Sequence, residues 1–175
     1  MSAPQFRLRP ARPTDLVAVV ALEQATQYAP HWSPAVYAAI LAGQGESGDS
    51  QTKAPPHCIV VAEQGDEPGA SLNGFAVGVM HPAAGDCQAD ERLAELDSVV
   101  VAAEARRAGI GRALCSAVIE WCRSRGATAI VLEVRSKSHG AIALYAELGF
   151  VPAGRRPHYY RDPQDDALTM RLALP

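Results

Sequence analysis

The residues best suited to bind a ligand form one short segment, Arg106 to Arg112, with the sequence RRAGIGR. Glycines let a backbone approach a ligand closely, and the free amides and dipole at the start of a helix favour a phosphate. Arginines add charge-assisted hydrogen bonds. Two glycines alone would serve a tight strand-to-helix turn equally well, so it is the arginines that favour an anion-binding turn.

The same turn excludes several common ligands. It matches neither the GxxxxGK[ST] loop that holds nucleoside triphosphates nor the GxGxxG fingerprint of dinucleotide-binding proteins. A nucleoside triphosphate or a nicotinamide is therefore poorly supported. The remaining candidate is a ligand that carries a pyrophosphate but is neither a nucleoside triphosphate nor a nicotinamide dinucleotide.

Two side chains could move protons. Glu133 lies inside the apolar run 129–134, where an ionised carboxylate is costly unless it is bonded or solvated, and partial desolvation would raise its pKa toward that of a useful base. On periodicity alone, a carboxylate at the polar edge of a sheet or one paired with Arg135 is the favoured interpretation. Tyr145 carries a phenol of reference pKa ~10 that can protonate a leaving group, although aromatic residues at helical spacing usually pack in a core.

The elements that must position these residues alternate between strands and helices. Helices are expected from Pro13, from Pro34 to Gly43, from Gly109 to Gly126 and from His139 to Leu148. Apolar or alternating runs predict strands over 6–9, 58–62, 74–80, 96–101, 129–134, 150–156 and 168–174, with long loops over 43–56 and 81–91. This order favours an α/β fold whose mixed sheet has a parallel or near-parallel central pair and is covered on both faces.

Composition narrows the class further. A chain of 175 residues with 48% hydrophobic residues suits a single domain over 1–175. The net charge of -3 gives no general reason to bind nucleic acid or an anionic membrane, and a basic amine fits it better. No signal segment and no apolar run near the ~20 residues of a membrane span is visible, so we expect a cytoplasmic protein. The cysteines lack CxxC spacing, which favours reduced thiols over a metal site.

Strand 96–101, the R-x-x-G-x-G turn of Arg106, Gly109 and Gly111, and the later run AIALYAELGF from Ala141 to Phe150 together resemble the GNAT acetyltransferase superfamily. The resemblance implies a mostly antiparallel sheet with a splayed, near-parallel central pair, and acetyl-coenzyme A as cosubstrate without a metal. It places the pyrophosphate on backbone amides of the turn and the pantetheine arm on strand 96–101. The implied coenzyme contacts are Val99, Val101, Arg106, Arg107, Ala108, Gly109, Ile110, Gly111, Arg112 and Ser138.

Within the superfamily, the segment from Leu132 to Tyr160 is most similar to the ribosomal-protein alanine N-acetyltransferases. That resemblance gives Glu133 the role of general base and places the phenol of Tyr145 at the coenzyme sulfur as general acid. Ser138 departs from the subfamily, which commonly has an asparagine there that bonds the coenzyme arm. The loops 43–56 and 81–91 are also longer than the subfamily requires, which bears on the choice of acceptor.

The predicted function is acetyl transfer to a primary amine, with the α-amine at a protein N-terminus as the first hypothesis. A small-molecule amine acetyltransferase of the same fold is the alternative, and a catalytically silent acyl-coenzyme A sensor is a third class. The expected partner is a peptide or protein amine, and the chain is expected to be a monomer or homodimer. Candidate acceptor contacts, for which surface packing is the alternative, are Trp32, Arg156, Tyr159 and Tyr160.

Overall fold

The computed structural model describes residues 6–43, 55–64, 71–82 and 91–175. Seven strands form one sheet in the order β1-β2-β3-β4-β5-β7-β6. The strands are β1 (Phe6–Pro10), β2 (His57–Gln64), β3 (Leu72–Met80), β4 (Leu93–Val101), β5 (Ala129–Arg135), β6 (Val151–Arg161) and β7 (Gln164–Ala173). The helices are α1 (Leu16–Gln24), α2 (Pro34–Gly43), α3 (Ile110–Ser124) and α4 (His139–Glu147), with short 3₁₀ turns at η1 (Pro13–Asp15) and η2 (Ala103–Ala105).

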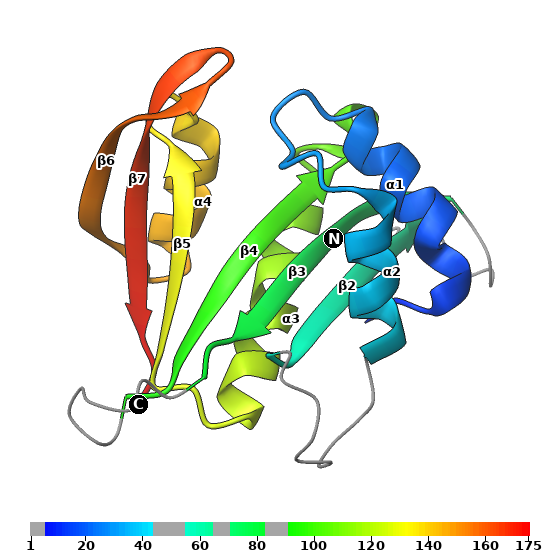
Figure 1. The fold of residues 1–175 in the computed structure, drawn as a ribbon, viewed down its shortest axis with the longest axis horizontal. Coiled ribbons are helices and arrows are strands. Elements are labelled where there is room, and N and C mark those ends of the chain that lie inside the picture. Colours follow the sequence, from blue (N-terminus) through cyan, green and yellow to red (C-terminus); the bar gives the residue numbers. More distant parts are fainter. Residues whose placement is uncertain (1–5, 44–54, 65–70, 83–90) are drawn as a thin grey trace.

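The two central strands of the sheet, β4 and β5, diverge from one end to the other. All neighbouring strands are antiparallel except β4 and β5, which run parallel and pair only over 93–95 with 129–131. Beyond Glu95 the two strands diverge, and the far end of β4 has no strand partner on its β5 side among the described residues (Figure 1). The splayed parallel pair thus divides the sheet into a four-stranded half and a three-stranded half.

Helices cover both faces of the sheet. One core cluster joins α3 and α4 to the sheet around Leu114, Val118 and Phe150. The other lies under α1 and α2, where Val19 and Tyr37 are fully buried. Figure 1 shows α1 and α2 in front of the four-stranded half and α3 behind it. The apolar side chains that α1, α2 and α3 bury pack against the sheet, which accounts for the layered arrangement.

The structure confirms the fold class predicted from the sequence, including the mostly antiparallel sheet and its splayed parallel pair. Every predicted strand and helix is present, and β2, β3, β4, β6 and β7 extend at least two residues beyond a predicted end. Most of the predicted loops 43–56 and 81–91 lies outside the described residues. Within the described segments, no helix is long and apolar enough to cross a membrane.

Candidate active site

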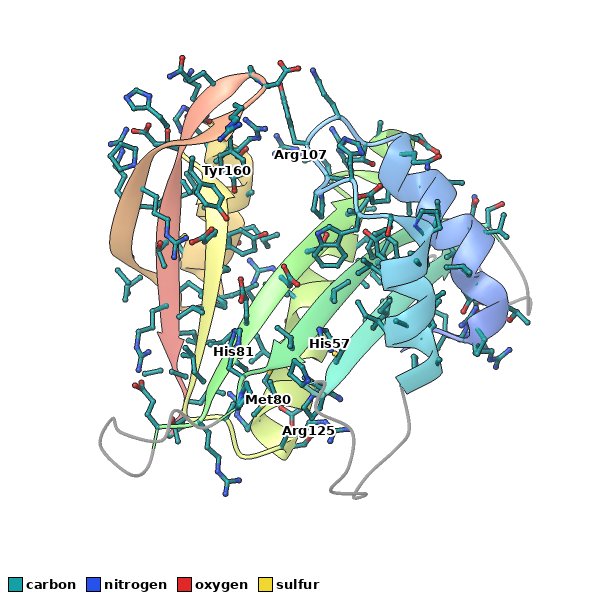
Figure 2. All side chains as sticks on the ribbon, in the orientation of Figure 1. His57, Met80, His81, Arg107, Arg125 and Tyr160 are labelled. Carbon is teal, nitrogen blue, oxygen red and sulfur yellow. The ribbon has the colours of Figure 1, made fainter. Side chains whose placement is uncertain are left out.

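The splay between β4 and β5 opens into a cavity of about 1090 Å³, which we call the splay cavity. Its walls are β4, β5, α4, the turn before α3, the end of β6 and the segment 26–32 between α1 and α2. In Figure 2, Arg107 and Tyr160 lie at the wide end of the opening, and His81 lies near the end where the strands converge. A single cavity therefore collects residues from both halves of the sheet.

The turn before α3 has the geometry of an anion site. Arg107 and Gly109 adopt positive φ angles of 64° and 82°, so the backbone reverses twice within three residues. Alternation of this kind can converge successive amides on one point. Gly109 caps α3, and no side chain of the described residues caps its first turn. The first amides of a helix have no partner inside the helix, and these open beside the cavity.

Most of the predicted coenzyme contacts line the splay cavity. Ala108 does not, and Ile110, the first residue of α3, is buried with 2% exposure, so each could reach a ligand only through its backbone. Arg112 forms an ion pair with Glu147 of α4, and Arg106 Nε donates to the carbonyl of Val101 at 3.3 Å. The residues that line the cavity are Val99, Val101, Arg106, Arg107, Gly109, Gly111, Arg112 and Ser138.

Replacing Gly111 with valine should weaken coenzyme binding more than replacing Arg112 with alanine. A Cβ at position 111 would stand 3.4 Å from Leu144 and 3.8 Å from Val101, so a branched side chain would enter the space beside the turn. Arg112, exposed and already paired with Glu147, is the lesser contributor. Calorimetric titration of acetyl-coenzyme A into both variants tests this, with thermal melts to check folding. Unchanged affinity in a folded Gly111→Val protein would reject the site.

Glu133 projects from β5 and is held by groups on β6. Arg156 Nε lies 3.0 Å from Glu133 Oε1, and the phenol of Tyr159 donates a hydrogen bond to the carboxylate. That hydrogen bond raises the pKa of Tyr159, so the phenol stays protonated. The partner of Glu133 is thus Arg156, and the alternative pairing with Arg135 is not found. Glu133 keeps 20% of its side chain exposed toward the cavity.

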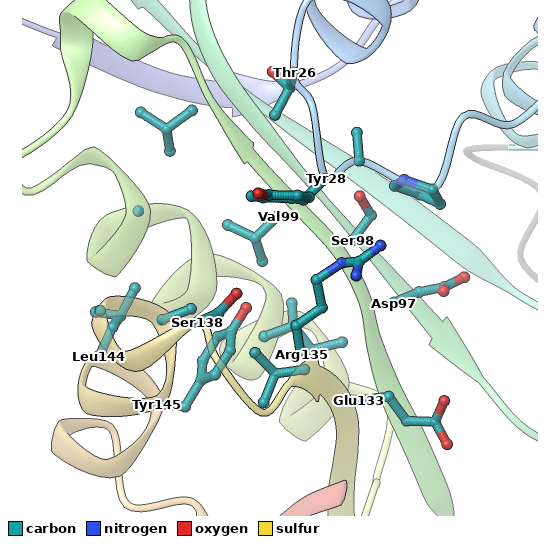
Figure 3. A pocket seen from close by; sticks show the side chains of 18 of the residues that line it. Thr26, Tyr28, Asp97, Ser98, Val99, Glu133, Arg135, Ser138, Leu144 and Tyr145 are labelled. Carbon is teal, nitrogen blue, oxygen red and sulfur yellow. The ribbon is translucent and has the colours of Figure 1, made fainter. Parts of the chain in front are cut away.

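Tyr145 lies on α4 at the opposite side of the cavity from segment 26–32 (Figure 3). Its ring packs against Phe150 with centroids 6.0 Å apart. Burial raises the pKa of the phenol above its usual value, so Tyr145 is a neutral hydrogen-bond donor at physiological pH. Tyr145 packs against the core and also lines the cavity.

Arg135 also lines the cavity, although it was not among the site residues predicted from the sequence. Its guanidinium carbon lies 5.0 Å from the ring centre of Tyr28 and 4.2 Å from that of Tyr160. Its terminal nitrogens donate to the carbonyls of Asp162 and Pro163 at 3.0 and 2.8 Å. Cation–π contacts of this kind link segment 26–32 to the hairpin of β6 and β7 across the splay. No sequence signal pairs Tyr28 with Tyr160, since they are distant in the chain.

The predicted acceptor contacts differ in position. Tyr159 and Tyr160 line the cavity and pack edge to face, with centroids 5.1 Å apart. Trp32 also lines the cavity, and it packs 5.4 Å from Tyr37, so it anchors α2 as well. Arg156 lies outside the lining and reaches the site through Glu133. Among the residues that the structure describes, no group of His, Cys, Asp or Glu is arranged to hold a metal ion.

The fold and the cavity together define an acyltransferase of a known class. A family model described as the acetyltransferase (GNAT) family matches residues 18–150, so the chain belongs to the GNAT family of N-acetyltransferases. The splayed strands and the R-x-x-G-x-G turn fall inside the matched region.

More particular likenesses concern ribosomal-protein acetyltransferases. The [ribosomal protein bS18]-alanine N-acetyltransferase of Escherichia coli (strain K12) is 40% identical over 83 residues, which cover 46% of this chain and 56% of that protein. The chain spans about half the length of the curated relatives it matches. The crystal structure of the Escherichia coli ribosomal-protein-S18-alanine N-acetyltransferase superposes with a TM-score of 0.68 at 28% identity, covering 96% of this chain and 93% of that one.

A more distant structure shares the fold alone. The NatC complex bound to Gag peptide and CoA gives a TM-score of 0.79 at 20% identity, covering 98% of this chain and 99% of that chain.

Proposed function

We propose that this protein transfers the acetyl group of acetyl-coenzyme A to the α-amine of a peptide or protein, as the ribosomal-protein alanine N-acetyltransferases do. The observation that carries the proposal is the splay cavity, because it joins an anion-binding turn to a carboxylate and a phenol. The sequence likeness to the bS18-alanine enzyme supports the choice of acceptor.

The residues present fit the coenzyme. Uncapped amides at the start of α3 and the arginines beside them suit a pyrophosphate, and the free edge of β4 past Glu95 suits an extended, amide-bearing arm. When bound, acetyl-coenzyme A supplies an activated acetyl thioester. Val99 and Val101 offer backbone groups on that edge, and the hydroxyl of Ser138, which also lines the cavity, takes the place of the amide that the subfamily commonly has.

The protein's own groups then handle the protons. Glu133 accepts a proton from the attacking nitrogen, directly or through water, and Arg156 fixes the direction of its carboxylate. Tyr145 donates toward the departing sulfur, which it can do because its phenol remains protonated. Positioning of the amine against the thioester contributes further rate enhancement by removing the entropy cost of their encounter.

A panel of amines should show acetylation of peptides at the α-amine only. The panel contains free-N-terminus peptides, the same peptides with a blocked N-terminus and an internal lysine, and polyamines. Mass spectrometry locates the added acetyl group. We expect this selectivity because tyrosines of β6 and of segment 26–32 line the cavity entrance on both sides, which suits the end of a peptide chain.

Two outcomes would replace the proposal. Polyamines or aminoglycosides that react much faster than every peptide would establish the small-molecule alternative. Tight binding of acetyl-coenzyme A with no product from any amine would establish the silent sensor.

A further inference from the structure

A β-bulge interrupts β4 where it borders the cavity. The pairing of β4 with β3 steps from Ser98 directly to Leu96 and leaves Asp97 without a counterpart. Leu96 and Val99 both pack in the core under α3, although they are three positions apart. Since side chains alternate along a regular strand, the bulge turns both intervening residues to the opposite face. Figure 3 shows Asp97 and Ser98 on one side of β4 and Val99 on the other.

The two residues turned by the bulge are polar, line the splay cavity and have no hydrogen-bond partner among the described side chains. Ser98 is 6% exposed, and its Oγ has no hydrogen-bond partner in the described part of the chain. No described residue forms a hydrogen bond with the Asp97 carboxylate. Burial raises the pKa of Asp97 to about 6. A buried hydroxyl without a partner costs free energy, so its retention beside an unpaired carboxylate points to a polar ligand.

The neighbouring charges leave Asp97 unneutralised. Glu95, on the same strand, raises its pKa further, and His81, which follows β3, opposes this effect. His81 Nε2 is itself bound to Glu95 at 2.9 Å. From α2, the phenol of Tyr37 faces the same region, and its pKa is raised by burial, by Glu23 and by Asp97. At neutral pH the Asp97 carboxylate is therefore mostly ionised, and no described residue forms an ion pair with it.

An amine acceptor needs two proton acceptors when it arrives charged. An α-amine has a reference pKa of ~8 and is mostly an ammonium ion at neutral pH. It must lose one proton to become a nucleophile and a second one as the amide forms. Glu133 takes one of them in the proposed function, so the other has no assigned acceptor.

We propose that Asp97 and Ser98 form the subsite for the acceptor's ammonium group, in which Ser98 Oγ accepts a hydrogen bond from the nitrogen and Asp97 takes the first proton. This inference rests on the proposed function and adds to it the residues that select a cationic acceptor. Asp97 and Glu133 then face the amine from the two strands that bound the splay, β4 and β5 (Figure 3).

The protons balance over the whole acetyl transfer. The ammonium gives one proton to Asp97, and the free amine forms a C–N bond with the acetyl carbon. The C–S bond breaks, the second nitrogen proton passes to Glu133, and Tyr145 protonates the sulfur. Glu133 returns its proton to Tyr145, and Asp97 releases one proton to solvent, so an ammonium and a thioester become an amide, a thiol and one proton.

Binding of an unreactive ternary complex tests the subsite. Calorimetry at neutral pH measures a free-amine peptide that begins with alanine, and separately its N-acetylated form, binding to protein saturated with coenzyme A. Asp97→Asn should weaken the free-amine peptide by about tenfold or more, as loss of a charged hydrogen bond does, and leave the acetylated peptide unchanged. Ser98→Ala should weaken the free-amine peptide without lowering the melting temperature. Glu120→Gln, which removes one exposed charge on α3, is the matched control.

The pH profile supplies a second readout that a structural role would not change. In wild type, kcat/KM for the peptide should fall below a break near pH 6, where Asp97 becomes protonated. Glu133→Gln should keep this break, whereas Asp97→Asn should lose it and rise with pH toward ~8, where the amine is already neutral. Equal weakening of both peptides, or an unchanged break in Asp97→Asn, would overturn the subsite.

Failure of the proposed function can be distinguished from failure of the subsite. If wild type acetylates lysine side chains and no α-amine, the α-amine assignment is wrong, and the lysine peptide becomes the binding probe for the same variants. If wild type acetylates α-amines and Asp97→Asn binds and reacts as wild type does, only the subsite is wrong.

Discussion

Replacing Tyr145 with phenylalanine should lower kcat by about 100-fold or more, which is the usual value of general acid assistance. The substitution removes one oxygen and keeps the ring that packs against Phe150, so the fold should survive. Because the phenol is protonated throughout the working range, the loss should be similar at every pH from neutral upward. Steady-state kinetics across that range, with a saturating peptide, measure it.

The companion measurement is the affinity for acetyl-coenzyme A. It should stay close to that of wild type, since a group that acts on the leaving sulfur contributes mainly in the transition state. A near-normal kcat in Tyr145→Phe would assign Tyr145 to core packing and leave the sulfur to be protonated by water.

Replacing Glu133 with glutamine should also reduce kcat by about 100-fold at neutral pH, and the defect should persist as pH rises. Glu133 takes the second nitrogen proton, which leaves only as the amide forms, so loss of the first proton to solvent near pH ~8 does not replace it. The amide of glutamine can still contact Arg156 and Tyr159, so the wall of the cavity should keep its shape. The observable is the ratio of wild-type to variant kcat against pH.

Arg156→Lys distinguishes the role of the Glu133 carboxylate from that of the arginine that orients it. Lysine retains the charge but cannot reproduce the Nε contact of 3.0 Å, so it should give a smaller defect than Glu133→Gln. A Glu133→Gln variant whose defect disappears near pH ~8 would show that Glu133, and not Asp97, takes the first proton of the ammonium.

The sequence predicted the architecture because the signals for it are local. Glycines that end α3 and α4 adopt the positive φ angles expected after a helix, 78° at Gly126 and 94° at Gly149. The continuous apolar run of β5 marked a central strand. The bulge at Asp97 could not be predicted, because it depends on how β4 pairs with β3 and leaves the alternation of the sequence ambiguous.

The site could be predicted only where one residue carries the signal. Glu133 is a charge in an apolar strand, and the turn before α3 has a recognisable spacing. Asp97 is the same kind of signal, a charge inside the apolar strand from Leu96 to Val101, but it was not predicted as a site residue. The Arg135 contact with Tyr28 and Tyr160 exists only after three distant segments meet, so no local pattern contains it.

The short pairing of β4 with β5 has a consequence for the order in which substrates bind. In the described part of the chain, β4 pairs with β5 only through residues 93–95, so the three-stranded half that carries Glu133 is joined to the four-stranded half by few main-chain contacts. An extended ligand lying along the free edge of β4 would bridge both halves, and a ligand at a hundredfold excess over its Kd stabilises the state it binds by about 2.7 kcal/mol. Coenzyme binding would thereby hold β5 at its proper distance from β4. We therefore expect sequential addition, with the coenzyme first and the amine second.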